Sequence, residues 1–107
     1  MVYVDDMYLT EMGRYGRMRM SHMIADSTAE LIDAARSVGV QARWLQKSGT
    51  HQEHFDICMS KRKKLIGRAN VVECTVKELT IMCMYRREHG ILPTSIAVAM
   101  NWWRNKT

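Results

Sequence analysis

Two histidine–aspartate pairs are the residues of this sequence best suited to chemistry. His22 and Asp26 are four residues apart, so they share one face if residues 21–26 are helical. His54 and Asp56 are two apart, so both side chains point the same way if that segment is extended. Imidazole and carboxylate groups together can bind a divalent metal ion. The pairs therefore suggest a metal site, with His–Asp hydrogen bonds that order a loop as the alternative.

A second group of residues could bind phosphate. Ser60 precedes a basic run that we expect to be helical over residues 61–68, and a helix N-terminus attracts anions. Ser60, Lys61 and Arg62 would contact the phosphate there; the alternative is a basic helix face in contact with water. Residues 13–19 contain three arginines and a tyrosine, which could grip backbone phosphates or stack a base. An ordinary flexible loop is the alternative for that segment.

Length and composition set the class of protein. The 107 residues fit one domain, and the shares of apolar (47%) and charged (25%) residues are ordinary for a globular protein and exclude intrinsic disorder. The net charge of +5 favours anionic partners without choosing among them. No apolar stretch approaches the roughly 20 residues of a membrane span. The acidic opening segment does not resemble a signal peptide, so we expect a protein of the cytoplasm.

The pattern along the chain predicts alternating strands and helices. Ser27 and Glu30 form a capping box before a helix, and Thr75 and Glu78 form another. Residues 7–20 have no clean period and predict an irregular loop. The expected strands span residues 2–5, 40–45 and 71–75. The expected helices span residues 28–38, 61–68 and 77–89, with a last helix after Pro93.

This order predicts an α/β fold: a single small domain with a short, mostly parallel sheet and three to four helices. Ligands of such sheets bind beyond the carboxyl ends of the strands. Asp5, Trp44 and Thr75 lie at or near the three expected strand ends. We therefore expect a site at that edge, with Trp44 as a stacking wall.

Several strings resemble one known family, domain-of-unknown-function family 4031. They are Val2-Tyr3-Val4-Asp5-Asp6, Ser21-His22-Met23-Ile24-Ala25-Asp26, His54-Phe55-Asp56 and Ser60-Lys61-Arg62. The resemblance covers about residues 2–80 and leaves a C-terminal helical extension at about 91–107. It implies a phage or prophage accessory protein in a bacterial host cell, and it implies no reaction.

Together these features predict a protein that binds a small phosphate-bearing, nucleotide-like ligand. The expected ligand-binding residues are Asp5, Arg17, His22, Asp26, Trp44, His54, Asp56, Ser60 and Lys61, of which His22, Asp26, His54 and Asp56 could hold a divalent metal. One alternative is a metal-dependent phosphoesterase or nuclease. Another is a basic module that binds nucleic acid or a host protein. The adjacent Trp102 and Trp103 on the last helix predict a homodimer.

Overall fold

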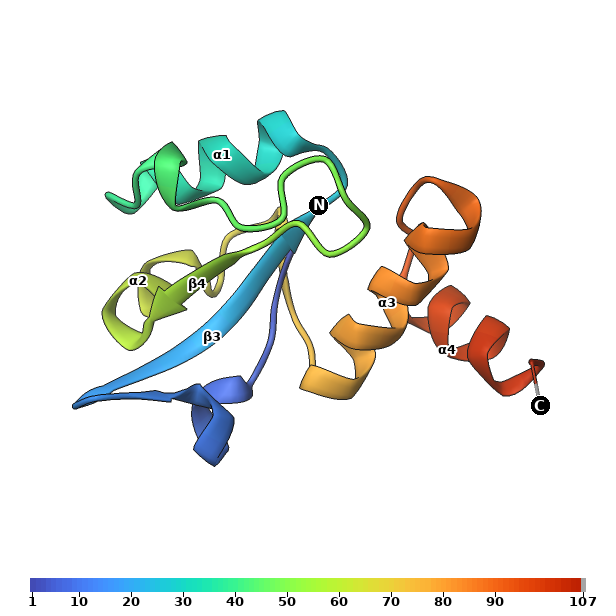
Figure 1. Cartoon of the computed structure of the whole chain (residues 1–107), viewed down its shortest axis with the longest axis horizontal. Helices are drawn as coiled ribbons and strands as arrows, with labels where there is room; N and C mark the ends of the chain where they lie inside the picture. The colour runs from blue at the N-terminus through green and yellow to red at the C-terminus, as the bar shows by residue number, and fades with distance from the viewer. Residues whose placement is uncertain (107) are drawn as a thin grey trace.

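The computed structural model describes residues 1–106, in which α-helices pack against a five-stranded mixed sheet (Figure 1). The strands are β1 (Val2–Val4), β2 (Arg14–Tyr15), β3 (Met18–Ala25), β4 (Phe55–Cys58) and β5 (Val71–Glu73). The α-helices are α1 (Thr28–Ser37), α2 (Met59–Leu65), α3 (Val76–His89) and α4 (Ile96–Arg104). Short 3-10 turns lie at η1 (Met7–Leu9), η2 (Glu11–Gly13) and η3 (Ala42–Trp44).

The sheet is mostly antiparallel, so the prediction of a mostly parallel sheet is wrong. The long strand β3 pairs antiparallel with β1, β2 and β4. Within residues 1–106, β1 and β5 form the single parallel pair. The physical reason is the connection from β1 to β3, where the chain turns back through η1, η2 and β2 without a helical crossover.

Strand β3 takes in the end of the irregular loop predicted for residues 7–20 and most of the helical turn considered for residues 21–26. The rest of that loop forms η1, η2 and β2. The even-numbered and odd-numbered side chains of β3 point to opposite faces, and both faces are largely covered beyond Met20. A strand covered on both faces lacks the apolar–polar alternation that identifies a half-exposed strand. His22 and Asp26 are therefore not on one helix face: His22 lies within β3 and Asp26 follows its end.

The strand expected at residues 40–45 is also wrong. Residues 42–44 form the 3-10 turn η3, in which the Trp44 amide donates to the carbonyl of Gln41. Val40 and Leu45, on either side of this turn, both pack against the core. Their apolar side chains gave residues 40–45 the weak alternation that predicted a strand.

The helices and the strands β1 and β5 confirm the predictions with small shifts, whereas β2 and β4 were not predicted. Helix α1 begins where the Ser27 hydroxyl accepts from the Glu30 amide, and α3 begins at the full capping box of Thr75 and Glu78. Strands β1 and β5 also lie where the sequence places them. Helix α2 starts earlier than expected, with Cys58 as its N-cap residue.

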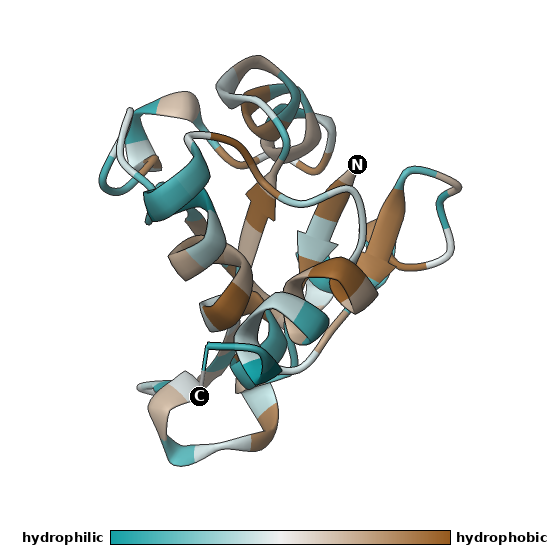
Figure 2. Ribbon diagram, turned by 90° about the vertical axis from the view of Figure 1, so that its right-hand side faces the viewer, coloured by the Kyte–Doolittle hydropathy of each residue, from teal (hydrophilic) through white to brown (hydrophobic). Residues whose placement is uncertain are grey.

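The sheet separates two hydrophobic clusters. One cluster packs the sheet against α1 and α2, with Met23 and Phe55 fully buried. The other packs it against α3 and α4, through Tyr3, Ile24 and Met82. Figure 2 shows the strands largely in hydrophobic colours between the helices. Among the described residues, no helix combines the length and the apolar character that crossing a membrane requires.

We predict that Gly13→Ala destabilises the fold at the η2 turn. A Cβ atom there would lie 2.3 Å from the carbonyl oxygen of Met7 and 2.8 Å from that of Met20, and backbone atoms cannot rotate away. The expected loss in the free energy of unfolding, measured with urea, is in the upper part of about 1–3 kcal/mol. The control is Gly16→Asn in the open β2–β3 turn, where asparagine tolerates the left-handed backbone. Equal midpoints for Gly13→Ala and the wild type would contradict this packing.

Candidate functional site

Three polar residues lie in a row across neighbouring strands. His22 of β3 and Asp56 of β4 are direct cross-strand partners. On the other side of β3, the amide of Asp5 donates to the carbonyl of His22 at 3.1 Å. His54 precedes Asp56 by two residues and points to the same face. The row and His54 therefore lie together on the face that α3 partly covers.

A fully buried carboxylate fixes the His22 ring. Asp5 Oδ2 accepts from His22 Nδ1 at 2.7 Å, and Asp5 Oδ1 accepts from the amides of His22 and Met7 at 2.8 and 3.1 Å. The hydrogen bond to Asp5 raises the pKa of His22 above its ordinary value, although partial burial of the ring acts in the opposite direction. Because Asp5 accepts at Nδ1, the neutral His22 ring presents the lone pair of Nε2.

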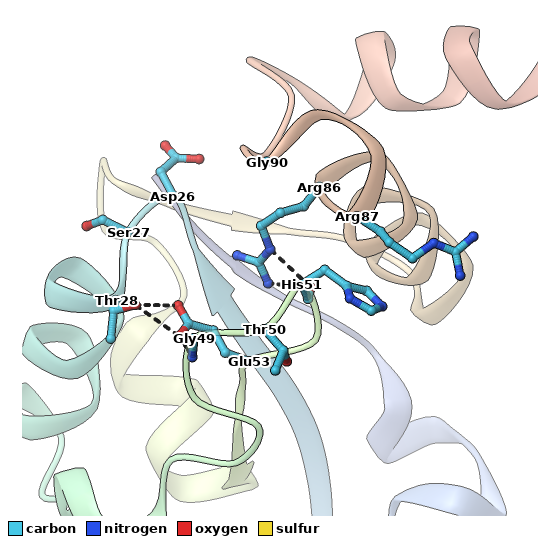
Figure 3. Close-up of a pocket in the computed structure, with 10 residues that line it drawn as sticks. All are labelled: Asp26, Ser27, Thr28, Gly49, Thr50, His51, Glu53, Arg86, Arg87 and Gly90. Atoms are coloured by element: carbon cyan, nitrogen blue, oxygen red, sulfur yellow. Dashed lines mark hydrogen bonds between the residues drawn. The ribbon is translucent and has the colours of Figure 1, made fainter.

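His54 is held in the same tautomer by the backbone. Its Nδ1 donates to the carbonyl of Gln52 at 2.7 Å, which leaves Nε2 as the free acceptor. The loop before it is clamped at two points (Figure 3). Arg86 of α3 donates twice to the carbonyl of His51, and the buried Glu53 carboxylate accepts from the Thr28 hydroxyl. These contacts fix the loop that leads into β4, and the hydrogen bond to Gln52 orients the ring of His54.

The free nitrogens of both rings converge on Asp56. His54 Nε2 lies 3.5 Å and His22 Nε2 lies 3.9 Å from Asp56 Oδ1. These distances exceed the upper limit of about 3.2 Å for N–H···O hydrogen bonds. They are close to the roughly 3.4 Å that separates neighbouring ligand atoms around a tetrahedral zinc ion with bonds near 2.1 Å. One ligand atom from each residue lies within 4.8 Å of the others, so one ion can reach all three.

The outer partners of this cluster match those of protein metal sites. Asp56 Oδ2 accepts from the Gln46 side-chain amide at 2.7 Å, which leaves Oδ1 facing the two rings. Each of the three candidate ligands is therefore oriented by a further hydrogen bond, as histidine and carboxylate ligands of metals usually are. We refer to His22, His54 and Asp56 as the His–Asp cluster.

Two spaces adjoin the His–Asp cluster. A hollow of about 360 Å³ is lined by His22 and His54 together with the cations Lys47 and Arg87. A larger groove of about 620 Å³ contains Asp56 in its lining. The side chains of the cluster are 16–36% exposed, so the cluster is accessible from solvent.

Some predicted site residues lie elsewhere. Asp26 Oδ2 is 2.9 Å from the amino group of Met1 and lies beside the start of α1 (Figure 3). Arg17 is in the β2–β3 turn, five residues from His22, which corresponds to about 16 Å along a strand. Ser60 Oγ lies 3.3 Å from Cys58 Sγ. Asp26 and Ser60 thus have partners outside the His–Asp cluster, and Arg17 lies at the far end of β3 from it.

Trp44 and Lys61 lie at the groove. Trp44 is 61% exposed and lines it, as a stacking wall would. The Lys61 ammonium reaches Gly39, another lining residue. The helix that carries Lys61 is not a uniformly solvated basic face, because Arg62 is buried and pairs with Glu73 at 3.1 Å.

Sequence reasoning predicted Asp5 as a site residue, but it did not name the two other groups that orient the cluster. The isolated β-bridge between Gln46 and His54 joins the two ends of the loop before β4. This pairing allows Gln46 to contact Asp56, and the carbonyl of Gln52 contacts His54 within the same loop. Lys47 and Arg87 come from separate elements, and neither forms part of a local motif. The sequence feature that pointed to Gln46 was its position, close to Trp44 and eight residues before His54.

The fold and the cluster define a small α/β protein with two histidines and one carboxylate gathered on its sheet. Residues 2–84 match the family described as "Protein of unknown function (DUF4031)", so the chain belongs to this family and the resemblance is confirmed. The match ends within α3, and α4 lies beyond it. No curated protein and no solved structure matches the chain.

We predict that His22 and His54 carry their proton on Nδ1 in the neutral state of the metal-free protein. Long-range ¹⁵N–¹H NMR at alkaline pH distinguishes the two tautomers. Asp5→Asn should weaken the preference at His22, because an amide can present its NH₂ group to the ring, and should leave His54 unchanged. An Nε2–H tautomer at His22 in the wild type would contradict the geometry.

Proposed function

We propose that this protein is a metal-dependent phosphoesterase whose divalent ion is bound by His22, His54 and Asp56. The observation that carries the proposal is the approach of two Nε2 atoms to one carboxylate oxygen at 3.5 and 3.9 Å, with both Nδ1 atoms engaged elsewhere. Three protein ligands leave coordination positions for water and substrate, which is typical of catalytic rather than structural sites.

The charges around the cluster favour an anionic substrate. Lys47 and Arg87 line the same hollow as His22 and His54, and the chain as a whole is basic. His22, His54 and Asp56 would hold the ion, which would supply a water of lowered pKa as the nucleophile for ester hydrolysis. Hydrolysis would replace the ester P–O bond with a bond from phosphorus to the water oxygen, and the leaving alcohol would take up the proton that the water loses. The two cations would stabilise the negative charge that develops on the phosphoryl oxygens.

Binding without hydrolysis is the second candidate. The same cations and the exposed Trp44 support a site for a small nucleotide-like ligand even if no ester is cleaved. The geometry favours the enzyme, because a site that only binds phosphate does not need two imidazoles with free acceptor nitrogens. A nucleic-acid module through Arg14, Arg17 and Arg19, a homodimer and a cytoplasmic location in a bacterial host stay predictions.

We predict that His54→Ala and Asp56→Ala each weaken Zn²⁺ or Mn²⁺ binding by at least about 100-fold in calorimetric titrations. The reason is that each change removes a ligand itself, whereas loss of a residue that only orients a ligand typically costs 10–100-fold in metal affinity. The matched controls are His89→Ala and Asp26→Ala. His89 also donates from Nδ1 to a backbone carbonyl, and Asp26 is a carboxylate outside the cluster. Both controls should bind metal as the wild type does.

Wild-type protein that binds neither ion, or controls that lose as much affinity as the cluster variants, would refute the metal site.

A second assay distinguishes the phosphoesterase from the protein that only binds its ligand. With metal bound, the enzyme should release alcohol from a simple phosphodiester or phosphomonoester, and Asp56→Ala should abolish the release. Tight metal binding without any ester cleavage would leave the binding protein and reject the enzyme.

A further inference from the structure

We infer that the groove beside the His–Asp cluster is a base-binding subsite, so that the substrate is a nucleoside phosphate rather than a simple sugar phosphate. This inference rests on the proposed function, because the phosphate of the same molecule would lie at the metal. The groove has a volume of about 620 Å³, within the range of small-molecule sites. Its lining includes Met7, Met20 and Trp44.

Large apolar side chains are exposed around this groove to an unusual degree. Met12, Tyr15 and Trp44 are 70%, 71% and 61% exposed, and Met18 is also exposed. All four line the groove: Met12, Tyr15 and Met18 come from the stretch around the β2–β3 turn, and Trp44 comes from η3. Flat aromatic rings and adaptable methionines form the kind of surface on which a planar base stacks.

The groove meets the proposed metal site at Asp56, the one member of the His–Asp cluster in its lining. Asp56 and Gln46 both line it, and the hydrogen bond between them is the one that turns Asp56 Oδ1 towards the two imidazoles. A ligand whose ring lies against Trp44 would therefore extend along Gln46 to the ion. This arrangement favours one bipartite molecule over an apolar partner, which would have no use for the carboxylate at the end of the groove.

Polar groups at the rim suit the edge and the charge of a nucleotide. The side-chain amides of Gln41 and Gln46 can donate to and accept from a base. Arg14 also lines the groove, and the guanidinium of Arg43 lies 5.2 Å from the centre of the Trp44 ring. Cation–π contact with Arg43 would hold that ring in place for stacking.

The test compares two probes with the same anionic group on the zinc-loaded full chain. They are hydrolysis-resistant phosphonate analogues of adenosine monophosphate and of ribose 5-phosphate. The wild type should bind the adenosine compound at least tenfold more tightly. Trp44→Ala should weaken that compound alone by about 5- to 150-fold, the loss that corresponds to one stacked base. Trp44→Phe should retain most of the affinity.

The control variant is Leu9→Ala, which removes an exposed apolar side chain outside the groove and should change neither affinity. Zinc affinity should be the same in every variant, so a failure of the metal site is recognised separately. Equal affinity of the wild type for the two probes would overturn the base subsite and leave the metal site intact. Conversion of a dimer to a monomer by Trp44→Ala would also overturn it, because the groove would then be an interface between copies.

Discussion

The burial of the Asp5 carboxylate is the constraint on which the rest of the structure depends. A buried charge without hydrogen bonds would be very costly, and Asp5 is satisfied by groups from several elements. Its oxygens accept from the amide of Met7 in η1 and from the amide and ring of His22 in β3. Its carbonyl accepts from Arg62 Nε of α2. One residue thereby fixes the return of the chain after β1, the position of α2 and the orientation of the first candidate ligand.

The same arrangement explains why the polar cluster is at the surface of a well-packed sheet. Residues next to the cluster in sequence, Met23, Phe55 and Ile57, are buried on the opposite face and anchor β3 and β4. Alternation along both strands then forces His22, His54 and Asp56 onto the other face. There α3 leaves them partly uncovered, while Arg86 of that helix secures the loop that leads to His54. Packing on one face therefore supports chemistry on the other.

Local signals predicted the helices and the strands β1 and β5, whereas long-range pairing decided the sheet. The capping residues Ser27 and Thr75 and the β-branched Val71–Val72 act locally, so α1, α3 and β5 could be predicted from sequence. The strand direction could not, because β2 has only two residues and gives no periodic pattern beside the two-residue turn that Gly16 opens at positive φ. The spacing of His54 and Asp56 was informative because it holds for any extended segment. The spacing of His22 and Asp26 misled because it assumed a helix, and only the burial of Asp5 shows which residue partners His22.

The central claim is that one divalent ion is held by two imidazole nitrogens and one carboxylate oxygen. An anomalous-difference map from crystals of zinc-loaded protein, recorded on either side of the zinc absorption edge, tests this most directly. The account predicts one strong peak about 2.0–2.2 Å from His22 Nε2, His54 Nε2 and Asp56 Oδ1, with Asp5 still bonded to His22 Nδ1. A strong peak on other residues, or a map with no peak at the cluster at saturating zinc, would contradict it.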